Sequence, residues 1–342
     1  MLARALLVLA AALILTPLAL AAGGPDPGVL QAGSGITAAN GAVRFVTLQA
    51  GSVTTLEAIA TNGGGILNTA LIRGGWGIPL VDFNGSVGGL STNGRTLVLG
   101  PTGFGTCKPD GCSPLRRATS FQVVNPKTLR HRATVTLRGD YAFDALSPNG
   151  QRLYLIHHLS AANLDKYVVR AYDLTRHRLL PGAIADRTQR GWLMQGMPMA
   201  RATSAEGRHA YTLYANPGGY PFVHALDTVA GHAHCIGIPW TNVQSQGDLD
   251  LLKLGADGRQ LSVGRINGPI AGRRMYFNVD THSYRITPIK AAPDSGFPWW
   301  TLSLLALAFP AAVVVVARKR SQHAIPQSKP EIQAWPRSAS SG

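Results

Sequence analysis

Five stretches of the chain share one alternation of apolar and polar positions. Each begins with small or apolar residues, passes through a turn that ends in an acid or amide plus glycine, and continues into a run rich in β-formers. Asp, Asn and Gly favour such turns because Gly tolerates positive φ and the short polar side chains bond their own backbone. The pattern therefore predicts a tight strand–turn–strand unit around each of five glycines: Gly41, Gly94, Gly150, Gly207 and Gly258.

The spacing of these units predicts a repeat fold. Successive turn glycines lie 53, 56, 57 and 51 residues apart, and periods near 50 residues are typical of repeat architectures. A second β-rich segment, which closes in its own polar turn, follows each glycine by 20 to 31 residues. Each repeat is thus predicted to hold four antiparallel strands, A to D, which is the blade of a β-propeller. The polar turns of this second segment centre on Thr61, Asn125, Asp173, Asp227 and Asp280.

Two phrases within the repeats carry a family resemblance. The A-to-B phrase at 147–156 (SPNGQRLYLI) and the C-to-D phrase at 172–180 (YDLTRHRLL) resemble the repeats of YVTN and WD40-like propellers. The resemblance covers roughly residues 36 to 289. It implies an all-β propeller of about five four-stranded blades, although no blade carries the Gly-His and Trp-Asp signature and many relatives have six or seven blades. Function is not implied, because these propellers host enzymes, scaffolds and receptors alike.

The ends of the chain predict export and a membrane anchor. The first 22 residues combine one basic residue, an apolar core and an Ala-Leu-Ala cleavage signal, which is typical of a secretory signal peptide. Near the other end, 21 uncharged residues carry two tryptophans at their start and are followed by Arg-Lys-Arg, as in a transmembrane helix whose basic end faces the cytoplasm. We therefore expect a single-pass type I protein of the cell membrane, with the propeller outside. The predicted parts are the signal peptide (1–22), an N-terminal linker (23–35), the propeller ectodomain (36–289), a juxtamembrane linker (290–296), the transmembrane helix (297–317) and a disordered cytoplasmic tail (318–342).

Charge narrows the choice of partners. The chain has a formal net charge of +15, and between residues 22 and 296 it has 26 Lys plus Arg against 16 Asp plus Glu. A solvated basic surface and attraction to anionic envelope polymers or lipid headgroups are both consistent with this excess. A nucleic acid partner is not expected outside the membrane.

Cysteine and histidine positions lead to two further expectations. Cys107 and Cys112 bracket a short turn in an exported chain, where oxidising conditions favour a disulfide. The remaining Cys235 alternates with His232 and His234, so it should point to the opposite face of its strand and pack against a neighbouring blade. The two histidines share a face, but a metal site needs further ligands, and we predict an exposed polar strand with neither metal nor cofactor.

Searches for catalytic motifs are negative. The sequence contains no G-x-S-x-G, no H-E-x-x-H, no P-loop and no dinucleotide fingerprint. Most carboxylates placed by the repeat are turn residues. An acid/base pair could still be assembled from Asp144, Asp248 or Asp250, although nothing in the sequence singles them out.

The repeat register separates two faces of the propeller. A-to-B and C-to-D turns share one face, here called the turn face, and the longer B-to-C and D-to-A connections share the other, the long-loop face. The long connections hold the three ectodomain tryptophans, and aromatic residues are enriched in binding sites. The alternative is that each tryptophan fills the core between adjacent blades. The residues predicted to contact a ligand are Trp76, Trp192, Gln195, Trp240 and Gln244.

The sequence thus predicts a membrane-anchored extracytoplasmic propeller that binds a protein or an envelope glycan, held close to the bilayer by its short linker. Two alternatives stay open: an extracytoplasmic enzyme like the lactonases or lyases among YVTN relatives, and a sensor that signals through the short tail. Ligand identity, oligomeric state and closure of the ring are left open by the sequence.

Overall fold

The computed structural model describes residues 26–289, apart from 104–106, 109–110, 113–114, 161–165, 187, 189–193, 217–218, 241–247 and 267–272. They belong to the first of two compact units, which ends at Ile289. The residues described contain no helix long and apolar enough to cross a membrane. The predicted signal peptide, transmembrane helix and cytoplasmic tail lie outside the described residues and stay predictions.

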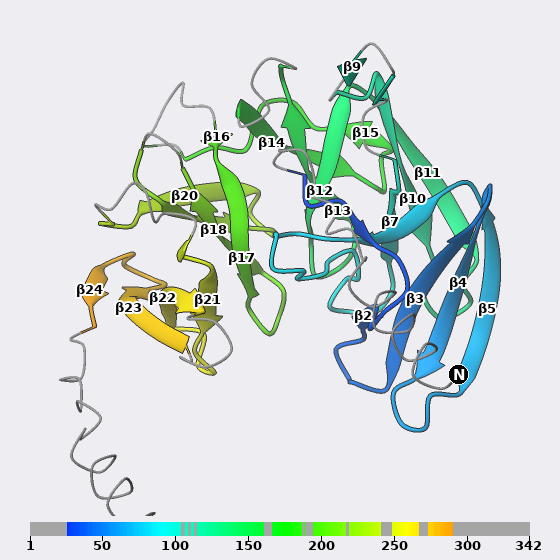
Figure 1. Cartoon of the computed structure of the whole chain (residues 1–342), viewed down its shortest axis with the longest axis horizontal. Helices are drawn as coiled ribbons and strands as arrows, with labels where there is room; N and C mark the ends of the chain where they lie inside the picture. The colour runs from blue at the N-terminus through cyan, green and yellow to red at the C-terminus, as the bar shows by residue number, and fades with distance from the viewer. Residues whose placement is uncertain are drawn as a thin grey trace, which may run out of the picture. The chain divides into compact units, whose positions relative to one another are not determined.

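Five antiparallel sheets of four or five strands follow one another in chain order (Figure 1). The first sheet contains β2 (Ile36–Thr37), β3 (Val43–Ala50), β4 (Val53–Ala60) and β5 (Ile66–Arg73). The second contains β1 (Val29–Leu30), β6 (Trp76–Pro79), β7 (Leu97–Pro101), β10 (Ala118–Val124) and β11 (His131–Arg138). The third contains β12 (Asp140–Leu146), β13 (Arg152–His158), β14 (Lys166–Asp173), β15 (Arg178–Leu179) and β16 (Met194–Gln195). The fourth contains β17 (Met197–Thr203), β18 (His209–Ala215), β19 (Phe222–Asp227) and β20 (His232–Gly237), and the fifth contains β21 (Leu251–Leu254), β22 (Gln260–Ile266), β23 (Arg273–Asp280) and β24 (Ile286–Pro288).

The predicted turns form where the sequence places them. All five turn glycines have positive φ, at 71°, 63°, 70°, 75° and 69° along the chain. Aspartate holds the C-to-D turns of the third, fourth and fifth sheets. Asp173 Oδ1, for example, accepts the N–H groups of Thr175 and Arg176, each at 2.9 Å. The four-stranded antiparallel repeat predicted from the sequence is therefore confirmed, and the described chain has an all-β propeller fold.

The core lies between sheets. Each pair of consecutive sheets shares a cluster of buried apolar side chains, so the apolar face of one sheet is covered by the next sheet. Examples are Phe45 with Leu99 between the first and second sheets, Phe121 with Phe143 between the second and third, and Leu213 with Val263 between the fourth and fifth. Two smaller clusters fill the space between the third and fourth sheets. This layering is what positions turns from neighbouring sheets side by side.

The second sheet differs from the sequence prediction. Its strand A, turn and start of strand B were expected within residues 89–99, with Trp76 in the preceding connection, but β6 already begins at Trp76. The chain then leaves the sheet at residues 80–89 before β7 begins, and Figure 1 shows this cyan segment reaching toward β17. Phe83 N donates to Pro198 O at 2.9 Å, and the side-chain amide of Asn84 contacts the carbonyl oxygen of Asp250. Long-range contacts to the fourth sheet and the start of the fifth therefore hold a segment that reads locally as a turn.

The first sheet has one face packed on the second sheet and another that is open. Leu48 and Leu71 on the open face are 57% and 74% exposed. None of the described core clusters combines residues of the first and fifth sheets. Among the described strands, the first strand of the chain, β1, pairs with β6 of the second sheet and not with the fifth sheet.

Candidate functional site

Three hollows open on the turn face, each between two consecutive sheets. The first hollow lies between the first and second sheets and has a volume of about 570 Å³. The second lies between the second and third sheets, at about 500 Å³. The third lies between the third and fourth sheets, at about 490 Å³. The sequence favoured the long-loop face for binding, whereas these hollows form among the tight turns.

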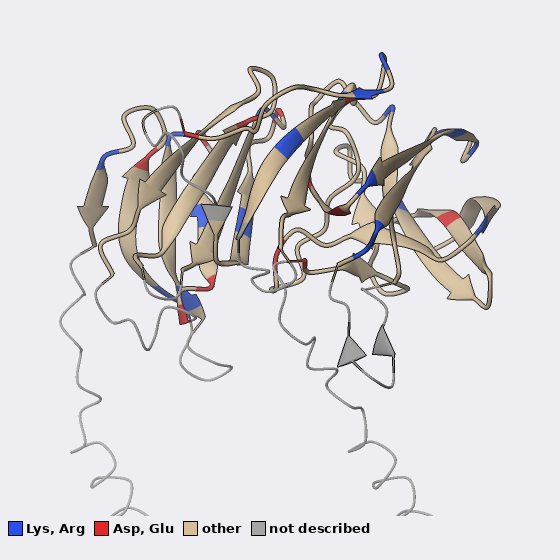
Figure 2. Cartoon of the chain, turned by 90° about the horizontal axis from the view of Figure 1, so that it is seen from above, with Lys and Arg blue, Asp and Glu red and all other residues tan. Residues whose placement is uncertain are grey.

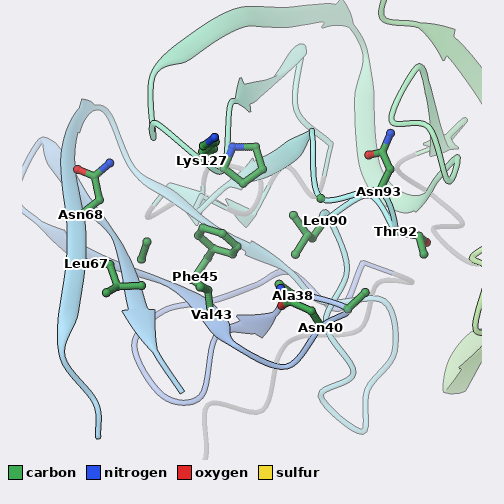
Figure 3. A pocket seen from close by; sticks show the side chains of 14 residues that line it. Ala38, Asn40, Val43, Phe45, Leu67, Asn68, Leu90, Thr92, Asn93 and Lys127 are labelled. Carbon is green, nitrogen blue, oxygen red and sulfur yellow. The ribbon is translucent and has the colours of Figure 1, made fainter. Parts of the chain in front are cut away.

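The first hollow has an apolar floor (Figure 3). Val43 and Phe45 come from β3, and Leu90 comes from the segment that precedes β7. Phe45 is almost fully buried in the core between the two sheets, while Val43 and Leu90 are partly exposed. The floor of the hollow is therefore a continuation of the core, which makes it a preformed surface.

Amide side chains surround this floor. Asn40 and Asn93 belong to the A-to-B turns of the first two sheets, and Asn68 lies on β5. Each amide oxygen is engaged by backbone: Asn40 Oδ1 accepts Ala42 N at 3.1 Å, Asn68 Oδ1 accepts Thr69 N at 2.9 Å, and Asn93 Oδ1 accepts Arg95 N at 3.0 Å. Lys127, from the C-to-D turn of the second sheet, completes the rim.

The second hollow is basic. It shares Asn93 with the first hollow and adds Arg95, Arg132 and His177. All four of these side chains are exposed. Lys and Arg positions are otherwise spread over several sheets, with fewer Asp and Glu between them (Figure 2). The turn face gathers part of this dispersed charge around the second hollow, which lies next to the first.

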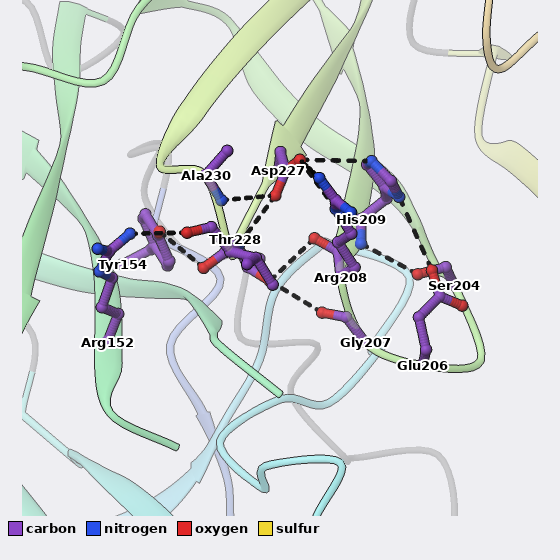
Figure 4. A network of polar contacts seen from close by, with 11 residues as sticks. Arg152, Tyr154, Ser204, Glu206, Gly207, Arg208, His209, Asp227, Thr228 and Ala230 are labelled. Carbon is purple, nitrogen blue, oxygen red and sulfur yellow. Dashed lines mark hydrogen bonds and ion pairs between the residues drawn. The ribbon is translucent and has the colours of Figure 1, made fainter. Parts of the chain in front are cut away.

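The third hollow is bordered by a polar network that joins two sheets (Figure 4). Tyr154 Oη donates to Thr228 O at 2.8 Å, and Arg152 Nη1 donates to Val229 O at 2.8 Å. Asp227 holds the turn through Val229 N at 2.9 Å and forms an ion pair with Arg208 at 2.9 Å. These contacts fix the C-to-D turn of the fourth sheet against β13, so their role is structural.

The carboxylates that the sequence left as acid/base candidates do not form one constellation. Asp144 is buried in an ion pair with Arg201, with 2.5 Å between Oδ1 and Nη2. Asp248 forms an exposed ion pair with Arg265 at 3.4 Å. Asp250 Oδ1 instead accepts the backbone N–H of residue 266 at 2.7 Å. Each carboxylate thus has separate partners.

A buried charge cluster between the second and third sheets was not found from the sequence. Arg116 lies 3.0 Å from Asp26 and 3.2 Å from Asp140, and His158 Nδ1 lies 3.0 Å from the other oxygen of Asp140. His158 Nε2 is buried without a hydrogen-bond partner among the described residues. Asp140 and His158 lie opposite each other on the β12–β13 hairpin, but Asp26 and Arg116 come from outside that hairpin and match no motif, so no local signal could have assembled the whole cluster.

The aromatic ligand candidates lie in two different core interfaces. Trp76 packs partly buried between the first and second sheets, and its Nε1 donates to Arg73 O at 2.7 Å. Trp240 packs between the fourth and fifth sheets, with its ring 4.9 Å from that of Tyr276. This agrees with the core alternative for these two tryptophans. The structure does not bring them together.

Of the other predicted contact residues, only Gln195 belongs to the described part of the chain. Gln195 lies on β16, opposite Lys166 of β14, and is partly exposed. Trp192 and Gln244 lie outside the described residues. Their contact with a ligand stays a prediction.

The cysteine predictions have different outcomes. β8 (Cys107–Lys108) and β9 (Gly111–Cys112) pair Cys107 directly opposite Cys112, but nothing of their side chains is described. The disulfide therefore stays a prediction, which this register favours because opposed Cα atoms lie within bonding range. Cys235 is buried between the third and fourth sheets, as expected, and burial raises its pKa to about 12.

The two histidines on β20 have different surroundings. His234 Nδ1 lies 2.8 Å from Asp186 Oδ2, and its ring stacks on Tyr284 with centroids 4.4 Å apart. His232 is exposed. No group of three or more His, Cys, Asp or Glu side chains that could hold a metal occurs among the residues described.

Comparisons with known proteins show similarity to solved structures alone. No protein-family model matches it, and no curated protein matches it significantly. Among solved structures it is similar to the hydrazine synthase of Kuenenia stuttgartiensis, with 13% identity over 80% of this chain and 68% of that one and a TM-score of 0.44. It is also similar to the β-propeller domain of Myceliophteria thermophila Cps50 (Swd1), with 10% identity over 75% and 76% of the two chains and a TM-score of 0.41. A third similar structure is a putative TolB from Agrobacterium tumefaciens, with 9% identity over 74% and 78% and a TM-score of 0.40. Because these values are low, the fold assignment rests on the strand register and the packing of the five sheets.

Proposed function

We propose that this protein is an extracytoplasmic binding module, anchored in the cell membrane by one helix, which captures a protein or glycan of the cell envelope. The observation that carries the proposal is the set of three hollows on the turn face, one between each pair of consecutive sheets from the first to the fourth. Preformed concave surfaces that combine apolar floors with a few polar groups are the usual form of binding sites. Their polar side chains are amides, hydroxyls and cations, with Asp173 as the one carboxylate among the lining residues, and such groups suit recognition.

Capture by the full-length protein tests this function. Tagged protein, solubilised in a non-ionic detergent, is incubated with cell-envelope fractions that lack the native protein. The proteins and glycans that bind to it are then identified. The turn-face variant is Asn93→Asp, in which a carboxylate oxygen still accepts Arg95 N at the turn. The long-loop variant is Trp192→Ala with Gln244→Ala. Circular dichroism confirms that both variants stay folded.

The two variants separate the outcomes. Loss of capture in Asn93→Asp alone supports binding at the turn face. Loss in the long-loop variant alone moves the site to the predicted contact residues and refutes the turn face. Failure of the wild-type protein to capture any envelope component would refute the binding module.

The proposed topology has its own test. N-terminal sequencing of the mature protein should find a start after residue 21 or 22, where the sequence predicts cleavage. Protease added to intact cells should degrade the propeller region and leave a tag on the C-terminal tail protected. A protected propeller would contradict the proposed orientation.

A further inference from the structure

The first hollow offers a ligand mainly hydrogen-bond donors. The amide oxygens of Asn40, Asn68 and Asn93 are each engaged by a neighbouring backbone N–H group. A carboxamide has an oxygen with two lone pairs and two N–H donors. Asn93 Oδ1 accepts a second bond, from Ser91 Oγ at 2.8 Å, so its NH₂ group is the part that remains for recognition. Asn40 and Asn68 each offer two N–H donors beside one remaining lone pair. Lys127 adds an ammonium group, and no carboxylate lines this hollow. Such a rim favours a ligand that accepts hydrogen bonds and carries negative charge.

The second hollow continues the same chemistry. It contains Arg95, Arg132 and His177, and no carboxylate is among its lining residues. None of the ion pairs described for residues 26–289 includes Lys127, Arg95 or Arg132. These exposed cations are therefore not neutralised within the described chain, and an anion reaching them would not displace an internal partner.

The first and second hollows lie next to each other, and this arrangement limits the shape of a ligand that contacts both. Asn93 lines both, and the A-to-B turns touch there, since Asn93 N donates to Pro148 O at 3.1 Å. A ligand that fills one hollow of about 570 Å³ and reaches the basic side chains of the next must be extended. The single carboxylate of the third hollow, Asp173, is already engaged by Arg176 at 3.2 Å.

The apolar floor distinguishes between kinds of polyanion. Val43 and Leu90 are partly exposed in the first hollow and can contact C–H groups. Sugar rings have such groups, whereas a chain of phosphates has none. Resting on the proposed binding function, we infer that the turn face binds an extended polysaccharide that carries carboxylate groups, with sugar rings on the floor of the first hollow and carboxylates at Lys127, Arg95 and Arg132.

The test measures binding of polygalacturonate to the full-length protein in a non-ionic detergent by isothermal titration calorimetry. Polygalacturonate should bind, and its affinity should fall as salt is raised, because ions screen exposed charges. Dextran, a neutral polysaccharide, should show no binding. Polyphosphate should bind at least about tenfold more weakly per charge, since it makes no contact with the apolar floor.

Matched variants locate the site. The triple variant Arg95→Gln, Lys127→Gln, Arg132→Gln should bind polygalacturonate about 100-fold more weakly, from the usual contribution of basic residues near an anionic surface. The control triple variant removes the same charge from strand ends on the long-loop face and should stay within about threefold of wild type. Its substitutions are Arg73→Gln, Arg117→Gln and Arg138→Gln.

Three results would overturn the inference: no binding of polygalacturonate, equal losses in the two triple variants, or equal binding of polyphosphate. The last two would show attraction by charge alone. If polygalacturonate fails to bind while Asn93→Asp still abolishes capture from envelope fractions, the binding function stands and only the ligand class is refuted. If Asn93→Asp leaves capture intact, the proposed turn-face site itself is refuted.

Discussion

Gly150→Ala should destabilise this protein considerably more than Gly94→Ala, although the two glycines occupy the same position of the same repeated turn. Their φ angles are alike, at 70° and 63°. Their surroundings differ. A Cβ atom on Gly150 would lie 2.3 Å from Thr96 Oγ1 and 2.6 Å from Thr96 Cβ, whereas a Cβ atom on Gly94 would have no neighbour within 4 Å.

The magnitudes follow from two separate effects. Alanine in the left-handed region costs about 1–2 kcal/mol, which is partly offset because alanine restricts the unfolded chain by about 0.4–1 kcal/mol. Gly94→Ala should therefore lower the free energy of unfolding by about 1 kcal/mol. Gly150→Ala adds overpacking between the second and third sheets, which typically costs about 1–3 kcal/mol. The expected difference between the two variants is thus about 1–3 kcal/mol.

Urea denaturation of the two variants, followed by tryptophan fluorescence, measures this difference. Equal m-values would confirm that both unfold the same surface. Adding Thr96→Gly to Gly150→Ala removes both of these close atoms and should restore part of the stability lost through overpacking. A difference below about 0.5 kcal/mol between the single variants, or no recovery in the double variant, would refute the view that the turns of neighbouring sheets pack this tightly.

Three further predictions concern buried or covalent contacts. Mass spectrometry of peptides from unreduced protein should find Cys107 joined to Cys112, and alkylation of either thiol without reductant would contradict the disulfide. Arg201→Met should lower the free energy of unfolding by about 3–5 kcal/mol, because it leaves the Asp144 carboxylate buried without its partner. The double variant Arg201→Met, Asp144→Leu should lower it much less. Additive losses in this double-mutant cycle would contradict a coupled pair. Burial lowers the pKa of His224 to about 4, so the unfolded chain takes up a proton near pH 6.5 before the folded protein does. The free energy of unfolding should therefore fall by up to about 3 kcal/mol as the pH drops from 6.5 to 4. His224→Phe should flatten this part of the pH profile, and an unchanged slope would contradict the assignment.

Local chemistry explains which predictions from the sequence succeeded. Gly41 and Gly258 adopt positive φ, and a Cβ atom on either would have no neighbour within 4 Å, so their turns need no help from the rest of the fold. Asp173 makes its turn with N–H groups two and three residues further on. Alternation along β20 placed Cys235 inside and His232 outside. Each of these features depends on neighbours within a few residues, and such neighbours can be read from a single sequence.

Long-range packing explains what the sequence missed. Trp76 begins a strand because β6 pairs with β7 across an excursion of the chain. That excursion is held by Pro198 and by the backbone of Asp250, more than 100 residues away. Asp140 and His158 face each other across the β12–β13 hairpin, but Arg116 joins them only when the second and third sheets pack.

The same division applies to the candidate site. By itself the sequence determined the five repeats, their Asx-Gly turns and the all-β fold, because period and turn chemistry are local properties. It placed Asn40 and Asn93 in these turns, and their amide oxygens do hold the turns. Only the tertiary structure decided that turns from consecutive sheets enclose hollows and bring these amides beside Lys127 and Arg95. The reason is physical: a hollow between sheets depends on how their buried side chains space them, and that spacing belongs to no single stretch of the chain.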